Sequence, residues 1–210
     1  IFLGDYIDRN VDSYKVVDKL ISLKLKYPEQ IKCLMGNHEL MLIKSVLFDD
    51  TLEFSMWLDN GGEETLFGYA EKAGLNKDNS FSFYAYFKNL NWVKSVIPDS
   101  HLDFFQNLDP YYAEGDFIFV HGGMNPSKDL ESHSVEHLCW DRSLCKFVCK
   151  LLRSEKKPHW EKVIVTGHNT KPFPIISEKF MMLDIGAYQG LLVTEINTRQ
   201  AFLAKPGNNR

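Results

Sequence analysis

The 210-residue sequence has no long hydrophobic run and no excess of positive charge. No stretch approaches the roughly 18 consecutive apolar residues that a membrane-spanning helix requires. Lysine and arginine number 24 against 28 aspartates and glutamates, which gives a net charge of -4 at pH 7. Because duplex-binding proteins usually carry a basic surface, this balance argues against nucleic acid. We therefore expect a protein whose partners include neither nucleic acid nor a membrane.

Cysteine is scarce, and its spacing lacks the paired short repeats of zinc-binding sequences. The four cysteines are Cys33, Cys139, Cys145 and Cys149. Cys33 lies in an apolar run and is interpreted as a small buried hydrophobe. The other three could form a structural zinc site with His137, but spacings of six and four residues do not favour one. Free thiols in a reducing compartment are the simpler reading, so we predict a cytoplasmic protein.

The sequence does not begin with methionine. It opens on Ile1-Phe2-Leu3, which reads as part of a buried strand. We therefore expect that a further N-terminal segment precedes these residues in the natural protein. The length suffices for one substantial domain and is short for two, so we predict a single, N-terminally incomplete domain over residues 1–210.

Two apolar runs near the start are each followed by a polar cluster. Residues 1–3 precede Gly4-Asp5-Tyr6-Ile7-Asp8-Arg9, and residues 31–35 precede Gly36-Asn37-His38-Glu39. We interpret residues 1–5 and 31–35 as strands. Open α/β folds place their chemistry at the carboxyl edge of the sheet, so the two clusters indicate one shared site.

The residues between these runs have the spacing of an amphipathic helix. Asp12 or Ser13 is the expected N-cap, and Tyr27-Pro28 is the expected end. The predicted apolar face carries Val16, Val17, Leu20 and Ile21. The order strand, helix, strand predicts a right-handed βαβ unit.

Residues 40–107 have a different composition, which favours several helices packed as a cap within the same domain. Aromatic residues are frequent there, and helical core packing explains them better than a base-stacking platform. They include Phe81, Phe83, Tyr84, Tyr86, Phe87 and Trp92. Residues 124–160 are predicted to be rich in loops. Further strands are expected at residues 116–120, 162–166, 180–184, 191–196 and 200–203.

Two of these strands end in histidine, at His121-Gly122-Gly123 and at Gly167-His168. Together with the two earlier clusters, four strand ends offer Asp5, Asn37, His121 and His168. Carboxylate and amide oxygens with two imidazoles suit Mn, Fe or Zn in a mixed oxygen and nitrogen site. A carboxylate such as Asp5 can bridge two metal ions, the arrangement used for in-line displacement at phosphorus.

Neighbouring side chains suit the rest of such a reaction. Arg9 offers a planar guanidinium that matches phosphate geometry. His38 is placed to act as the general acid, and Asp8 would hold its imidazole in the cationic form. Arg142 is a candidate second phosphate contact, with a surface ion pair as the alternative.

These motifs, in this order, resemble the calcineurin-like metallophosphoesterases, and most closely the phosphoprotein phosphatase branch in its bacterial and phage-like form. The resemblance extends from Gly4 to about Gly186. It implies a four-layer α/β/β/α sandwich of two mixed sheets flanked by helices, with a helical cap insertion. It also implies two divalent metal ions, with Mn expected for activity.

The resemblance also assigns roles to individual residues. Asp5 would bridge the metals, and the second metal site would be completed by Asn37, His121 and His168. His38 and Asp8 resemble the family's catalytic acid pair. Phosphate binding would fall to Arg9, to Asn37 and, by a looser match, to Arg142, which resembles an arginine that follows a tryptophan in bacterial members.

One family motif is missing. The family opens with a strand that ends in Asp-x-His and supplies further ligands of the first metal, and no Asp-x-His precedes Gly4 in this sequence. We therefore expect residues 1–210 alone to be a weak enzyme and the intact protein to be an active one.

The function predicted from the sequence is hydrolysis of phosphomonoesters by direct attack of a metal-bridging hydroxide. The expected substrates are phosphoserine and phosphothreonine in proteins, or a phosphorylated small molecule. Two alternatives stay open: a hydrolase similar to bis(5'-nucleosyl)-tetraphosphatase, acting on dinucleoside polyphosphates, and a catalytically impaired relative that binds phosphate or serves as a scaffold. The sequence leaves the oligomeric state open.

Overall fold

The computed structural model describes residues 1–75 and 89–205. The chain forms two compact units, Ile1–Asp109 and Pro110–Arg210. No helix in the described part of the chain is long and apolar enough to cross a membrane. Of the aromatic residues expected to pack in a helical core, Trp92 lies half-buried on a helix. The other five, between positions 81 and 87, fall outside the described residues.

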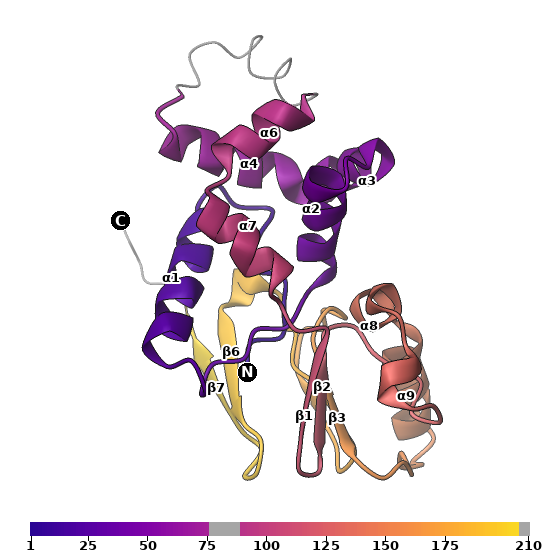
Figure 1. The fold of residues 1–210 in the computed structure, drawn as a ribbon. Helices are drawn as coiled ribbons and strands as arrows, with labels where there is room; N and C mark the ends of the chain where they lie inside the picture. The colour runs from indigo at the N-terminus through magenta and orange to yellow at the C-terminus, as the bar shows by residue number, and fades with distance from the viewer. Residues whose placement is uncertain (76–88, 206–210) are drawn as a thin grey trace. The chain divides into compact units, whose positions relative to one another are not determined.

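The N-terminal unit is built mainly from helices (Figure 1). Its elements are α1 (Ser13–Lys26), α2 (Asn37–Leu47), α3 (Thr51–Trp57), a π-helical turn (Leu58–Gly62), α4 (Glu63–Lys72), α6 (Leu90–Val96) and α7 (Asp99–Gln106). This agrees with the helical composition predicted for residues 40–107, within their described part. The large side chains at the centre of the unit include Trp57, Tyr69 and Phe105, all fully buried.

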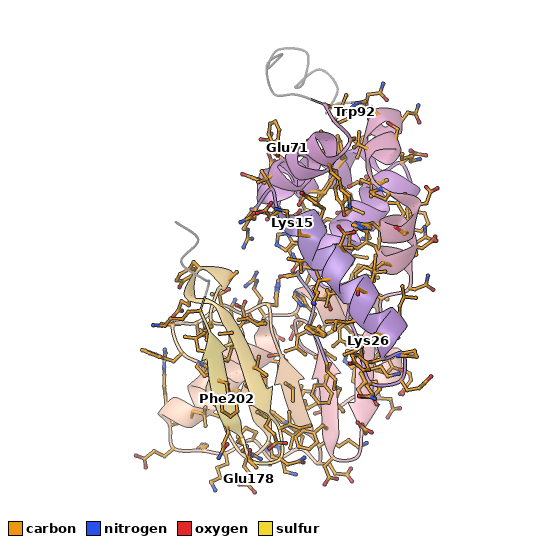
Figure 2. The ribbon with its side chains drawn as sticks, turned by 90° about the vertical axis from the view of Figure 1, so that its left-hand side faces the viewer. Lys15, Lys26, Glu71, Trp92, Glu178 and Phe202 are labelled. Atoms are coloured by element: carbon orange, nitrogen blue, oxygen red, sulfur yellow. The ribbon has the colours of Figure 1, made fainter. Side chains whose placement is uncertain are left out.

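The predicted helix between the two polar clusters is confirmed as α1, with Asp12 as its N-cap and Tyr27 as its C-cap. Lys15 and Lys26 mark its two ends in Figure 2. The predicted apolar face is only partly right. Val17 and Leu20 are buried together with the small Ser13, whereas Val16 is 46% exposed.

The two strands predicted before the polar clusters are wrong as strands. Residues 1–3 and 31–35 run parallel to each other but form only an isolated bridge, Phe2 with Cys33, and Leu34 makes a second bridge with Asp109. The ladder stops because the backbone turns sharply at Gly4, where φ is 100°. The parallel direction predicted for a βαβ unit is nevertheless present, with α1 between the paired segments.

The C-terminal unit contains a five-stranded mixed sheet with the strand order β1-β2-β3-β5-β4. Its central strands are parallel, and the two edge strands are antiparallel to their neighbours. A separate antiparallel hairpin joins β6 (Leu191–Glu195) to β7 (Gln200–Ala204), whose Phe202 is labelled in Figure 2. The strands of the main sheet are β1 (Tyr111–Glu114), β2 (Phe117–Val120), β3 (Val163–Thr166), β4 (Ile175–Ile176) and β5 (Phe180–Met182). These elements confirm a mixed α/β class, and the four-layer arrangement stays a prediction.

The prediction that residues 124–160 are rich in loops is wrong for most of that segment. It contains a 3-10 turn (Leu130–Ser132), α8 (Val135–Trp140) and the 11-residue α9 (Ser143–Arg153). In α9 the apolar Leu144, Cys145 and Val148 share one buried face, and cationic residues occupy the exposed one. The buried face packs against strand residues that include Val120, Ile164 and Phe180.

Candidate active site

The backbone is strained at several of the predicted site residues. Asp5, Asp8 and Arg9 have φ values of 60°, 78° and 62°, and His168 has a φ of 59°. Seven described residues other than glycine have positive φ, so these four make up more than half of them. Such conformations cost roughly 1–3 kcal/mol each and persist only where neighbours impose them. Their concentration at the polar clusters is typical of a functional site.

The strained first cluster is held by one buried carboxylate, Glu39. Its Oε2 accepts hydrogen bonds from the backbone N–H groups of Asp5 at 2.9 Å and Gly36 at 3.0 Å. Its Oε1 accepts from Tyr6 at 2.7 Å and Ile7 at 3.3 Å. Glu39 had no role among the site residues predicted from the sequence. The available signal was its position three residues after Gly36, where a carboxylate closes a capping box at the start of α2.

We expect Glu39→Gln to destabilise the protein by about 2–4 kcal/mol, because the amide NH2 would face N–H groups that need an acceptor. The free energy of unfolding by urea, followed by circular dichroism, measures this. Glu64→Gln, on the exposed surface of α4 in the same unit, is the matched control and should stay within about 0.5 kcal/mol of wild type. Equal stabilities of the two variants would contradict the role of Glu39.

A close approach at Gly36 brings the two clusters together. A side chain there would collide with the Oδ1 and backbone N of Asp5, so only glycine fits. The backbone N–H of His38 points at the same Oδ1, 3.4 Å away. Asn37 is buried between them in the first turn of α2. The fold therefore places the start of α2, which carries Asn37, beside the predicted ligand Asp5 within the N-terminal unit.

Asp8 and His38 form a buried pair, with Asp8 Oδ2 only 2.6 Å from His38 Nδ1. Trp57 Nε1–H donates to both carboxylate oxygens of Asp8, at 3.1 and 3.0 Å. The hydroxyl of Thr65 donates to Asp8 Oδ1 at 2.8 Å and accepts from the Asp8 backbone N–H at 2.8 Å. Four contacts thus fix the carboxylate that orients the His38 ring.

Both members of the pair hold a proton more tightly than usual. Burial raises the pKa of Asp8, and its hydrogen bonds with His38, Thr65 and Trp57 lower it only in part. Burial lowers the pKa of His38, but the hydrogen bond to Asp8 and the negative charges of Asp5, Asp8 and Glu39 outweigh it, so that pKa is raised. The two groups titrate as one unit, and the pair keeps its proton to higher pH than an isolated imidazole would.

Arg9 lies against the open side of His38. Its Nη2 is 3.3 Å from His38 Nε2, and its Nε donates to the carbonyl of Asn60 at 3.4 Å. The Arg9 backbone N–H donates to the carbonyl of Gly61 at 2.9 Å. The π-helical turn therefore positions the guanidinium next to the imidazole, on an exposed residue that an anion can reach.

We expect Trp57→Phe to lower kcat several-fold and leave the metal content unchanged, because Asp8 loses an N–H donor while an aromatic ring still fills the core. A hydrogen bond to a charged group contributes roughly 1.5–3 kcal/mol. Trp160→Phe is the control, since the Trp160 indole donates to the neutral carbonyl of Lys179 at 2.9 Å. Steady-state kinetics would contradict the assignment if both variants lost the same activity.

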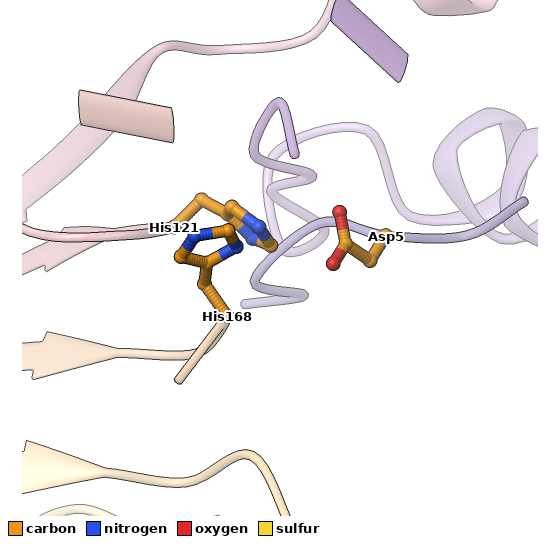
Figure 3. Close-up of side chains that lie close together, drawn as sticks. All are labelled: Asp5, His121 and His168. Atoms are coloured by element: carbon orange, nitrogen blue, oxygen red, sulfur yellow. The ribbon is translucent and has the colours of Figure 1, made fainter. Parts of the chain in front are cut away.

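In the C-terminal unit, two histidines meet at the ends of neighbouring parallel strands. His121 follows β2 and His168 lies just beyond β3, and both are buried. Their ring centroids are 5.0 Å apart, and each offers a ligand nitrogen within 4.8 Å of the other (Figure 3). Asp5, also drawn in Figure 3, belongs to the N-terminal unit. The register of β2 and β3 explains the pairing, since Val120 lies opposite Thr166.

Arg142 also lies near this pair. It precedes α9 as its N-cap, and its Nη1 donates to the backbone carbonyl of His168 at 3.5 Å. Asn169, the next residue, donates through its side-chain amide to the carbonyl of Gly122 at 3.2 Å, which ties the two histidine loops together. His121 and His168 were predicted from the sequence as metal ligands and Arg142 as a phosphate contact, and all three lie near one another in the C-terminal unit.

The donor chemistry of the predicted site fits a divalent metal. Two buried imidazoles within a few ångströms of each other are a common half-site for Mn, Fe or Zn. A comparison with models of known protein families matches residues 1–186 to the calcineurin-like phosphoesterases. The chain belongs to this family. A phosphoesterase of this family is a metal-dependent hydrolase, so the match confirms the predicted superfamily and the general reaction.

Within this phosphoesterase, the predicted site residues separate into two groups. Asp5, Asp8, Arg9, Asn37 and His38 lie in the N-terminal unit. His121, Arg142 and His168 lie in the C-terminal unit. Three residues that hold the first group belong to motifs of the sequence but were given no role from it, namely Glu39, Trp57 and Thr65. Trp57 and Thr65 lie 49 and 57 residues from Asp8, too far for a local pattern to show the contact.

Proposed function

We propose that the protein hydrolyses phosphomonoesters and that its substrates are phosphoserine and phosphothreonine in proteins. The observation that carries this proposal is the buried Asp8–His38 pair with Arg9 against its open side. An alkyl leaving group such as serine is a poor one and needs a proton as it departs. A fixed imidazole beside a phosphate-binding guanidinium suits that requirement.

We further propose that Asp5, Asn37, His121 and His168 hold two divalent metal ions and that Mn supports activity. Family membership and the mixed oxygen and nitrogen donor set support this assignment. When bound, the metals would lower the pKa of a coordinated water and neutralise charge on the phosphoryl group. The remaining contributions come from side chains of this chain.

Arg9 binds the phosphoryl oxygens through its planar guanidinium. Arg9 Nη2 lies 3.3 Å from His38 Nε2. An anion bound to Arg9 would draw Nη2 away from this nitrogen. His38 Nε2 can then carry the proton that the leaving oxygen takes up. Asp8 accepts a hydrogen bond from the protonated Nδ1 of His38 and so holds the orientation of the ring. Arg142, beside the carbonyl of His168, supplies a second contact for the phosphoryl group.

Hydrolysis of a phosphoserine peptide and of diadenosine tetraphosphate by one preparation of the full-length, Mn-loaded protein tests the substrate class. We expect the larger kcat/KM for the phosphopeptide. A preference for diadenosine tetraphosphate would replace the proposal with a dinucleoside polyphosphate hydrolase. Hydrolysis of neither substrate, with metal bound, would favour a phosphate-binding scaffold.

A further inference from the structure

A basic groove runs along α9 in the C-terminal unit. It has a volume of about 710 Å³ and lies between α9 and residues 169–175. Five cationic side chains line it, and no carboxylate does. They are Arg142, Lys146, Lys150, Arg153 and Lys171. This is a local concentration of positive charge on a chain whose net charge is -4.

The cations on α9 form a row rather than a cluster. Residues 142, 146, 150 and 153 recur every three or four positions, so they share one face of the helix and span about 16 Å. In the described part of the chain, none of the five cations of the groove forms an ion pair with a carboxylate. Lys157, just beyond the helix, does pair with Glu178 at 3.3 Å. The row is therefore free to bind an anionic ligand.

The groove starts at the predicted active-site edge. Asn169, which lines it, directly follows His168, and Arg142 reaches from the groove to the carbonyl of His168. A ligand that placed its phosphoryl group at His168 would have its neighbouring residues beside α9. This step rests on the proposed function, because it takes His168 to be at the phosphate site.

The length and spacing of the row favour an extended peptide. Alternate side chains of an extended strand are about 6.7 Å apart, and residues four apart on a helix rise by about 6 Å. Five extended residues span about 13 Å and present three alternate side chains, so acidic groups there would lie beside three of the four cations in the row. A nucleotide concentrates its phosphates over a shorter length and would leave part of the row unused.

The other wall of the groove suits the opposite side of such a peptide. Phe173 is 76% exposed and lies between Pro172 and Pro174, and all three line the groove. Side chains that alternate with the acidic ones would face this apolar wall. We propose that the groove binds an extended acidic segment that flanks the phosphorylated residue of a protein substrate.

Binding of a fluorescein-labelled peptide with glutamate at alternate positions, measured by anisotropy with the full-length protein at low ionic strength, tests the proposal without turnover. We expect Lys146→Glu/Lys150→Glu to raise Kd about tenfold or more, since exposed charge pairs contribute modestly and are here reversed. Lys156→Glu/Lys162→Glu, exposed and outside the groove, changes net charge equally and should change Kd less than about twofold.

Lys146→Gln/Lys150→Gln should give an intermediate Kd, which separates loss of charge from any disturbance by the two glutamates. Equal weakening in the groove variant and the control would overturn the proposal. Equal binding of a peptide with glutamine at the same positions would overturn it too. A competition experiment gives a third contradicting outcome. The proposal would be overturned if diadenosine tetraphosphate displaced the peptide and the groove variant bound diadenosine tetraphosphate more weakly but bound the peptide as wild type does.

Turnover separates this proposal from the proposed function. In an active preparation, the ratio of kcat/KM for the acidic phosphopeptide to that for its glutamine counterpart should fall about tenfold in Lys146→Glu/Lys150→Glu, mainly through KM. If no metal-loaded form hydrolysed either peptide, the phosphatase assignment would fail. The anisotropy result alone would then decide whether the groove binds the acidic peptide.

Discussion

Asp5→Asn should remove bound metal and activity together. The substitution keeps the shape of the side chain and an oxygen that can accept from the His38 N–H, now 3.4 Å from Oδ1. Asparagine also tolerates the left-handed backbone that Asp5 adopts, with φ of 60°. Folding should therefore survive. The change that remains is loss of the negative charge that a bridging metal ligand supplies.

Metal content by atomic emission and turnover of p-nitrophenyl phosphate measure this loss in the full-length protein. We expect metal content to fall by at least one ion per chain and kcat to fall by roughly 10³-fold or more, in line with losing a metal's contribution of several kcal/mol. Asp59→Asn, exposed on the π-helical turn, is the control and should match wild type. Wild-type metal content in Asp5→Asn would contradict the role of Asp5 as a ligand.

His38→Asn should keep its metal but lower kcat by roughly 10²–10⁴-fold, the usual contribution of a general acid. The imidazole is buried against Asp8, with 6% of the side chain exposed, and contacts Arg9 through its other nitrogen. Removing it leaves the leaving oxygen without a proton donor. Loss of metal in this variant would show that His38 acts as a ligand instead.

The nature of the leaving group sharpens this test. p-Nitrophenolate leaves without help, whereas a serine alkoxide requires protonation. The defect of His38→Asn should therefore be larger with a phosphoserine peptide than with p-nitrophenyl phosphate. His159→Asn, at an exposed position of the C-terminal unit, is the matched control. Equal defects with both substrates would contradict the acid assignment.

The order of residues in the sequence showed the positions of the polar clusters more clearly than it showed the secondary structure around them. The polar endings at Asp5, His121 and His168 were predictable because apolar runs stop at glycine before or beside a ligating side chain. The lengths of the first strands were not, because the turn at Gly4 and the positive φ of Asp5 end the pairing after one bridge. The strand propensity of neighbouring residues does not show where contacts around a site force the backbone to turn.

The supporting contacts escaped prediction for a different reason. Trp57 and Thr65 reach Asp8 only after α3, the π-helical turn and α4 have folded back onto the first cluster. The amphipathic α9 was missed because its buried residues are few and include cysteine as well as leucine and valine. Long-range packing decides such features, and a single sequence does not record it.

The central claim is that this member of the calcineurin-like phosphoesterases needs a divalent metal held by Asp5, Asn37, His121 and His168 to hydrolyse phosphate esters. The most direct test strips the full-length protein with a chelator and measures p-nitrophenyl phosphate turnover as Mn²⁺ is returned. We predict no turnover in the stripped protein and recovery that saturates at two metal ions per chain. Undiminished turnover after complete removal of metal would contradict it.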